Sequence, residues 1–275
     1  MSGKTAAWVN DPRSEASKAQ DLISRGDYSG SPVGRAVFFL VRSLDPFIQY
    51  SILAHGAGSA VLHRVGLHVL PSGPAAQTGI AAIDNLGLSP YRLILLGMAV
   101  GGVVKQNIWV TTIGVEPMPV RPAITIGFFN AFFDSLNSYL LITSTSAVLR
   151  NESDLTHAPI VLGSGLYLVG ILTELISEVQ RKRFKADPKN KGKPYTGGLW
   201  SFARHINYGG YTLWRAGAAL AGGGWIWGAI VGTFIFHDFA TRSVPILNEY
   251  CEVRYGEAWE KFKKQTQWRL IPLIY

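Results

Sequence analysis

The sequence contains little cysteine and little charge. Its 275 residues include one cysteine, Cys251, which excludes an internal disulfide framework and a cysteine metal cluster. Charged residues make up 16% of the chain, whereas a soluble domain usually carries about 25%. Several stretches exceed the roughly 18 weakly charged residues that predict a bilayer span. The composition therefore predicts an all-α, polytopic membrane protein.

Motifs of soluble nucleotide-binding and hydrolytic enzymes are also missing. The chain has no G-x-S-x-G elbow, Walker loop or G-x-G-x-x-G fingerprint, so a soluble-type nucleotide domain is not expected. The histidines lack clustered ligand spacing, and no metal site is expected. They are His55, His63, His68, His157, His205 and His237. Residues 1–30 contain no apolar signal-peptide segment, so we expect the first span to act as the targeting signal.

Apolar stretches of membrane length divide the remaining chain into spans. Six are predicted: 45–69, 91–115, 122–149, 158–180, 208–222 and 224–241. The last two share the turn Gly222-Gly223-Gly224 and predict a helical hairpin. We interpret residues 1–30 as a mobile polar tail, 31–173 as a transmembrane bundle around a substrate cavity, and 174–275 as a cofactor-binding region.

Basic residues predict the orientation. The net charge is +8, but these residues lie beside the spans, which favours membrane orientation and phosphate binding over nucleic-acid binding. Residues 181–193 contain seven Lys or Arg against one Asp. This loop and both termini are therefore expected in the cytosol. The sequon at Asn151 falls on the lumenal side, and we expect the endoplasmic reticulum membrane.

Polar residues inside the third and fourth spans are candidate substrate contacts. Asn130, Asp134 and Asn137 share one helical face, and Tyr167 begins a similar face on the next span. Polar groups in hydrocarbon are costly, so this face should point inward. It forms either the polar wall of a substrate pocket or a set of interhelical hydrogen bonds.

Two carboxylates follow Tyr167 one turn apart. Glu174 lies deep in its span, and an interior role is expected for it, whereas Glu178 lies beside the basic loop and suits an ion pair there. Lys105 lies deep in the second span. It is expected to pair with one of these acids, to contact a ligand, or to extend to the interface.

A cationic cluster followed by aromatic and amide residues ends the fourth span. Arg and Lys match phosphates, and Trp200 or Tyr208 can stack on a flat ring. Such a site suits an adenine dinucleotide phosphate and, more weakly, S-adenosylmethionine. An ordinary positive-inside loop explains the lysines but not the run Ala203-Arg204-His205-Ile206-Asn207-Tyr208.

Residues 174–275 resemble the C-terminal region of membrane-bound sterol reductases and steroid 5α-reductases, especially the short "steroid 5-alpha reductase-like" branch. The resemblance implies that NADPH binds through residues of the cationic cluster, the Arg-His-x-Asn-Tyr run and the terminal Tyr-Gly-x-x-Trp motif. These residues are Gln180, Arg181, Phe184, Lys185, Trp200, Arg204, His205, Asn207, Tyr208 and Tyr255. Many relatives carry Glu where this chain has Tyr211, so a sterol substrate is not implied.

The resemblance implies an NADPH-dependent reductase of a carbon–carbon double bond in a lipophilic steroid, terpenoid or similar substrate. Asn207, Tyr208 and Glu174 are the candidate catalytic residues, and the proton donor remains open among Glu174, Asp134, Tyr167 and Tyr208. Isoprenylcysteine carboxyl methyltransferases, which use S-adenosylmethionine, share the fold and an Arg-His-Pro-x-Tyr motif. Methyl transfer is therefore one alternative, and double-bond isomerisation and non-catalytic lipid binding are others. Expected partners are a lipophilic small molecule and membrane lipids.

Overall fold

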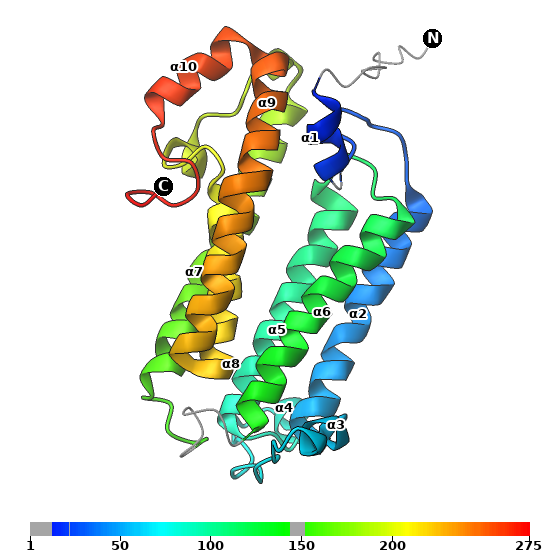
Figure 1. Cartoon of the computed structure of the whole chain (residues 1–275), viewed down its shortest axis with the longest axis vertical. Coiled ribbons are helices and arrows are strands. Elements are labelled where there is room, and N and C mark those ends of the chain that lie inside the picture. Colours follow the sequence, from blue (N-terminus) through cyan, green and yellow to red (C-terminus); the bar gives the residue numbers. More distant parts are fainter. Residues whose placement is uncertain (1–12, 22, 144–151) are drawn as a thin grey trace.

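The computed structural model describes residues 13–21, 23–143 and 152–275. These residues form a bundle of long helices, with short helices at both ends (Figure 1). The long helices are α2 (Pro32–His55), α5 (Pro90–Ile108), α6 (Val120–Ile142), α7 (Ala158–Ala186), α8 (Ile206–Asp238) and α9 (Val244–Tyr255). The shorter ones are α1 (Glu15–Gln20), α3 (Ser59–Arg64), α4 (Ala81–Asp84) and α10 (Glu257–Gln265).

Among the described residues, four helical stretches are long and apolar enough to cross a membrane. They are Pro32–His55, Pro90–Ile113, Ala158–Ala186 and Ile206–Tyr255. The second contains the π-helical turn η1 (Trp109–Ile113), and the last joins α8 to α9 through the π-helical turn η5 (Phe239–Ser243). The prediction of an all-α, polytopic membrane protein is confirmed.

The predicted hairpin is also confirmed. Gly224 interrupts α8 with φ 77° and ψ −170°, a conformation that glycine adopts without strain. Beyond it the chain runs back along the first arm, because a Cβ on Gly228 would lie 2.9 Å from that of Leu220, and one on Gly232 would lie 3.1 Å from that of Ala216. The second arm continues through η5 and α9 to the end of the bundle that carries α10 (Figure 1).

The prediction for the first span was wrong. It placed the span at 45–69, whereas the helix runs from Pro32 to His55. Proline is favoured in the first turn of a helix, and Gly56 ends this one in the left-handed conformation with φ 62°. The third predicted span begins as expected, but its helix ends at Ile142, and residues 144–149 lie outside the described residues.

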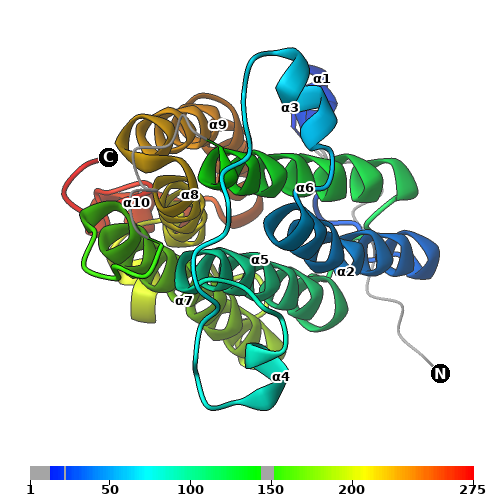
Figure 2. The ribbon, with the colours of Figure 1, turned by 90° about the horizontal axis from the view of Figure 1, so that it is seen from below.

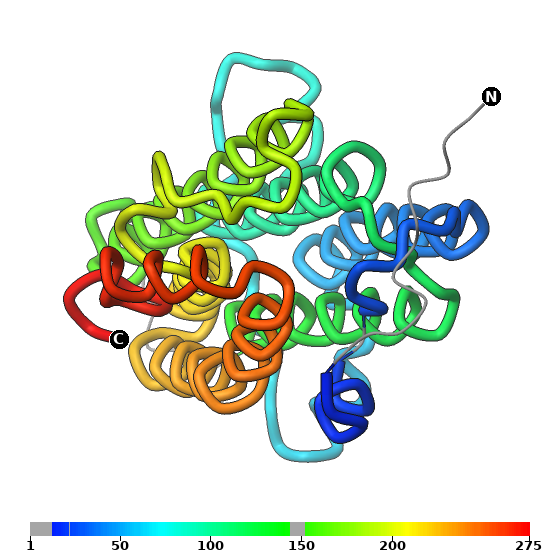
Figure 3. The backbone as a smooth tube through the Cα atoms, turned by 90° about the horizontal axis from the view of Figure 1, so that it is seen from above, coloured from blue at the N-terminus to red at the C-terminus, as the bar shows by residue number. Residues whose placement is uncertain are grey.

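Glycines let α7 and the first arm of α8 approach closely. A Cβ on Gly163 would lie 2.7 Å from the carbonyl oxygen of Gly217, and one on Gly170 would lie 2.4 Å from the amide nitrogen of Trp214. Such contacts are typical of packing between membrane helices. Seen from either end, α7, α8 and α9 form one side of the bundle, whereas α2, α5 and α6 form the other (Figures 2 and 3).

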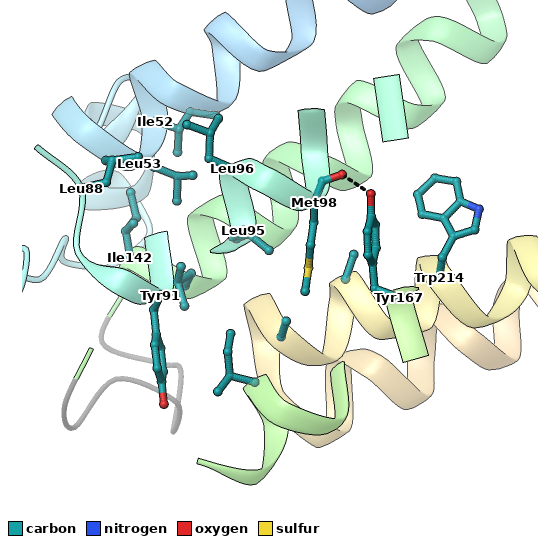
Figure 4. Close-up of a cluster of buried hydrophobic side chains, with 14 of the residues drawn as sticks. Ile52, Leu53, Leu88, Tyr91, Leu95, Leu96, Met98, Ile142, Tyr167 and Trp214 are labelled. Carbon is teal, nitrogen blue, oxygen red and sulfur yellow. Dashed lines mark hydrogen bonds between the residues drawn. The ribbon is translucent and has the colours of Figure 1, made fainter. Parts of the chain in front are cut away.

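The largest apolar core lies near the end of the bundle that carries α3 and α4. Figure 4 shows leucines and isoleucines of α2, α5 and α6 packed around Tyr91, Met98 and Tyr167. The Tyr167 hydroxyl donates to the carbonyl oxygen of Met98 at 2.7 Å and thereby ties α7 to α5. This packing leaves the opposite end of the bundle to form the candidate site.

Candidate functional site

A cavity of 580 Å³ lies at the end of the bundle that carries α1 and α10. Its size is within the usual range for a cofactor or drug-sized ligand. Segments that are distant in sequence form its walls, and they lie within 23–28, 109–116, 178–195, 200–205 and 247–262. Because α7 continues to Ala186, six residues beyond the predicted span, the cationic cluster forms an ordered helical wall rather than a loop.

Positive charge dominates this cavity. The cations are Arg25, Arg181, Lys182, Lys185, Lys191, Arg204 and Arg254, and the acids are Glu116, Glu178 and Asp187. Several cations bind neutral oxygens of the protein. Lys185 donates to the Tyr255 hydroxyl at 3.0 Å, Arg254 donates to the Tyr28 hydroxyl at 2.8 Å, and Arg204 donates to the carbonyl oxygen of Gln267 at 3.1 Å. Their charge therefore remains available to an anionic ligand group.

Glu178 organises the inner wall. Its Oε1 accepts from Asn207 Nδ2 at 2.7 Å, and its Oε2 accepts from an Arg181 guanidinium nitrogen at 2.6 Å. The Oδ1 atom of Asn207 is buried and has no hydrogen-bond partner in the described part of the chain. Glu178, which lines the cavity, thus fixes the amide plane of Asn207, which is not itself a lining residue, and leaves one acceptor of Asn207 unpaired. A buried acceptor of this kind needs a partner, and a ligand can supply one.

His205 presents a second set of unpaired atoms. The side chain is buried and lines the cavity, and neither ring nitrogen has a hydrogen-bond partner among the described residues. Burial, together with the charges of Arg204 and Arg181, lowers the pKa of His205 from 6.5 to about 3. The imidazole is therefore neutral at physiological pH and offers one donor and one acceptor.

The depressed pKa of His205 predicts a pH dependence of stability. The unfolded chain binds a proton below pH 6.5, whereas the folded chain does not until about pH 3, so stability falls as the pH decreases through this window. We expect wild-type protein to lose about 1 kcal/mol between pH 6 and pH 5 through this residue. Thermal unfolding at both pH values should show a smaller loss for His205→Gln and an unchanged loss for the exposed control His63→Gln. An equal loss in wild type and His205→Gln would contradict the assignment.

The structure brings six of the predicted cofactor residues together around the cavity. They are Arg181, Lys185, Trp200, Arg204, His205 and Tyr255. Gln180 instead supports the wall, because its Oε1 accepts from the amide of Leu199 at 2.9 Å. Phe184 packs against Tyr195, with ring centroids 4.9 Å apart.

The aromatic rings predicted to stack on a ligand are already covered by protein groups. Tyr208 stacks on Phe239 with ring centroids 4.6 Å apart and on His205 at 6.0 Å, and it does not line the cavity. Trp200 donates to the carbonyl oxygen of Ser177 at 2.8 Å. The Arg181 guanidinium carbon lies 5.2 Å from the centre of the Trp200 ring. These contacts correct the expectation that Tyr208 stacks on a flat ligand ring.

The predicted substrate residues of α6 form interhelical bonds instead of lining this cavity. Asn130 Oδ1 accepts from Gln106 at 2.9 Å, Asp134 accepts from Arg215 at 2.9 Å, and Asn137 Oδ1 accepts from Trp227 at 2.7 Å. Tyr167 belongs to the apolar core. Of the two interpretations of this polar face, interhelical bonding agrees with the structure.

Glu174 also lies apart from the cavity. Its carboxylate pairs with Lys105 of α5 and accepts from the indole nitrogen of Trp214 at 2.7 Å. Of the three possibilities expected for Lys105, pairing with an acid is the one that the structure shows. Glu174 therefore links α5, α7 and α8, and its role as a catalytic acid stays a prediction.

Two walls of the cavity were missed by the sequence analysis. One carries Ile23, Arg25 and Tyr28, from the region predicted to be a mobile tail, and the other contains Glu116, in the segment after η1. The Glu116 carboxylate makes no hydrogen bond or ion pair within the described ranges. The only hint in the sequence is an acid close to the end of an apolar span.

Comparison with known proteins shows where this arrangement belongs. Residues 120–266 match the model of the family described as "Protein of unknown function (DUF1295)". The chain belongs to this family. The chain is also 41% identical over 262 residues to the "Probable O-methyltransferase ustE" of Ustilaginoidea virens, a match that covers 94% of this chain and 91% of that protein.

Similarity of this family member to sterol reductases is shorter. It is 32% identical over 114 residues to "Delta(14)-sterol reductase erg24" of Schizosaccharomyces pombe, which covers 35% of this chain and 26% of that protein. The "Delta(14)-sterol reductase" of Methylotuvimicrobium alcaliphilum is 28% identical over 149 residues, covering 46% and 33%. The sterol-reductase resemblance is thus real but partial. The near full-length match favours methyl transfer, which the sequence analysis gave as an alternative, over the predicted NADPH-dependent reduction.

Proposed function

We propose that this protein is an S-adenosylmethionine-dependent O-methyltransferase that acts at the membrane on a lipophilic substrate. The near full-length similarity to a probable O-methyltransferase carries the proposal. A buried site beside apolar helices suits an acceptor that is delivered from the bilayer. This proposal replaces the expected NADPH-dependent reduction as the first hypothesis.

The charges of the cavity fit the amino-acid part of S-adenosylmethionine. Its carboxylate matches the cations Lys185, Arg204 and Arg254, which bind neutral protein oxygens. Its ammonium group matches the Glu116 carboxylate. When bound, S-adenosylmethionine supplies an electrophilic methyl group.

The chain's own residues position the acceptor. Neutral His205 can accept, at one ring nitrogen, a hydrogen bond from the substrate hydroxyl that receives the methyl group, and it can donate a hydrogen bond from the other nitrogen. Asn207 Oδ1 provides a fixed acceptor, because Glu178 holds the opposite side of the amide. Orientation of this kind contributes much of the rate in a bimolecular transfer.

NADPH-dependent reduction is the second candidate function. The excess of cations over acids in the cavity favours a ligand with several phosphates, and the partial similarity to Delta(14)-sterol reductases agrees with this. The charge of the cavity is therefore compatible with both cofactors, and a binding measurement is needed to distinguish them.

Calorimetry on purified protein in nanodiscs separates the two functions. We expect S-adenosylhomocysteine to bind and NADPH to bind at least about tenfold more weakly, a difference of about 1.4 kcal/mol. Binding of NADPH without S-adenosylhomocysteine would overturn the proposal in favour of reduction.

Glu116→Gln sharpens this comparison. Loss of the carboxylate should weaken S-adenosylhomocysteine binding by about tenfold, because an ionic hydrogen bond to the ammonium is lost. The same change should not weaken NADPH binding, because it removes a negative charge near the phosphates. The exposed Glu257→Gln is the matched control, since Glu257 lies outside the cavity.

The proposed topology has six membrane crossings. These are α2, α5, α7, the two arms of the hairpin formed by α8 and α9, and α6, which is not one of the four long apolar stretches but packs against α2 and α8. An even number of crossings agrees with the position of α1 and the C-terminal segment at one end of the bundle (Figure 1). The basic residues 181–193 lie at that end and support its cytosolic placement. The endoplasmic reticulum membrane is our proposed location.

A further inference from the structure

Residues 13–21 and 23–28, here called the N-terminal cap, are docked on α9. The Ser14 amide donates to one carboxylate oxygen of Glu249 at 2.7 Å, and the Ser17 hydroxyl donates to the other. Arg242 of η5 donates to the carbonyl oxygen of Gln20 at 3.1 Å. The expectation of a mobile tail was therefore wrong for these residues.

The C-terminal part of the cap, residues 23–28, turns at Gly26 and packs on α9. Gly26 has φ 74°, and a Cβ at this position would lie 3.2 Å from the hydroxyl of Tyr250. Arg254, on the next turn of α9, donates to the Tyr28 hydroxyl at 2.8 Å. Both Tyr250 and Arg254 line the cavity, so the cap forms part of the cavity wall.

Arg25 is the charged group that the cap brings to the cavity. Its Nε donates to Asp21 at 2.9 Å, and Arg13 donates to the same carboxylate oxygen at 2.7 Å. The terminal nitrogens of Arg25 make no hydrogen bond within the described part of the chain. A guanidinium held at Nε keeps its two terminal donors available for a carboxylate or phosphate.

We propose that the N-terminal cap encloses the cofactor cavity and that Arg25 binds the anionic group of the cofactor. This inference rests on the proposed function for the identity of that group, which is the carboxylate of S-adenosylmethionine. In a reductase it would be a phosphate of NADPH. The cap lies outside residues 120–266, the part matched by the family model.

Enclosure is tested without any ligand through Cys251. This residue is the single cysteine of the chain, is buried and lines the cavity. In intact protein in nanodiscs, we expect a maleimide to label wild-type Cys251 slowly. Ser17→Ala combined with Glu249→Gln should accelerate labelling by about tenfold or more, because these changes remove the Ser17 hydrogen bond and the carboxylate charge that hold the start of the cap on α9.

Glu252→Gln is the control for enclosure, because Glu252 lies one turn further along α9 and pairs with Lys263 of α10. Thermal unfolding of each variant shows that labelling reports the cap and not global unfolding. Equal labelling rates in wild type and in the stable double variant would overturn the enclosure.

Arg25 is tested by calorimetry with S-adenosylhomocysteine and with NADPH. For whichever of the two ligands binds wild type, Arg25→Ala should lower the affinity by about ten- to a hundredfold, and Arg25→Lys should lower it by less. The control Lys18→Ala should bind as wild type does, since Lys18 pairs with Glu15 away from the cavity. Unchanged affinity of Arg25→Ala would overturn its role.

Failure of the inference about the cap can be distinguished from failure of the proposed methyl transfer. If wild type binds NADPH alone, methyl transfer fails, whereas the role of Arg25 is tested on NADPH. If wild type binds neither cofactor, the proposed function and the role of Arg25 both fail. Cys251 labelling still supports or overturns the enclosure in that case.

Discussion

Asp134→Ala is expected to destabilise the protein by about 3–5 kcal/mol, because it leaves the buried guanidinium of Arg215 without its carboxylate. Asp134 Oδ1 accepts from Arg215 of α8 at 2.9 Å, and Oδ2 lies 3.6 Å from Arg42 of α2. Both arginines are buried, and Arg42 also pairs with Asp45 at 2.9 Å. A charge removed from water and then unpaired costs far more than a surface ion pair contributes.

Thermal unfolding in nanodiscs measures this effect. The control is Asp238→Ala, which breaks the half-exposed pair with Arg242 and should cost at most about 1 kcal/mol. If Asp134→Ala were as stable as wild type but inactive, α6 would have to contribute to a substrate pocket, as the sequence analysis first suggested.

The charges around Asp134 connect three helices in the interior of the bundle. Arg42 and Asp45 come from α2, Asp134 from α6 and Arg215 from α8. The pair of Lys105 with Glu174 adds α5 and α7 to this set of contacts. The polar residues of the membrane region are thus paired with one another across helices, which is how such residues are usually accommodated.

Apolar length and glycine placement made much of the fold predictable. The spans near 91–115 and 158–180 and the hairpin at Gly222-Gly223-Gly224 follow from patterns within one segment. The first span was misplaced because its apolar pattern continues past Gly56, and only the backbone conformation of that glycine shows where the helix ends.

The candidate site was predictable where its residues are close in sequence. The cationic turn at Arg181 and Lys185 and the run around His205 were found because each forms a compact motif. Arg25 and Glu116 were missed, since only the tertiary fold brings residues 23–28 and 109–116 to the same cavity. The role of Asn130 and Asn137 depended on which polar partners the neighbouring helices present, and a single sequence does not show this.

Asn207→Ala is expected to lower turnover by about a hundredfold or more, which corresponds to about 2.7 kcal/mol of lost transition-state stabilisation. Asn207 is held by Glu178 at 2.7 Å, and its buried Oδ1 has no partner within the described residues. The alanine variant loses this fixed acceptor and also leaves one oxygen of Glu178 without its donor. The fold should survive, because Arg181 still pairs with Glu178 at 2.6 Å.

Turnover can be measured as transfer of a labelled methyl group to acceptors in lipid extracts from cells that contain the protein, with thermal stability recorded in parallel. Asn137→Ala is the matched control, since Asn137 accepts at 2.7 Å from Trp227, which, unlike the Glu178 partner of Asn207, does not line the cavity. We expect the control to lose some stability and to retain near-normal turnover per folded molecule. The opposite pattern, with a stable and active Asn207→Ala and an inactive Asn137→Ala, would place the chemistry at the polar face of α6. Loss of turnover confined to Asn207→Ala would place it beside Glu178, which holds Asn207 and lines the cavity.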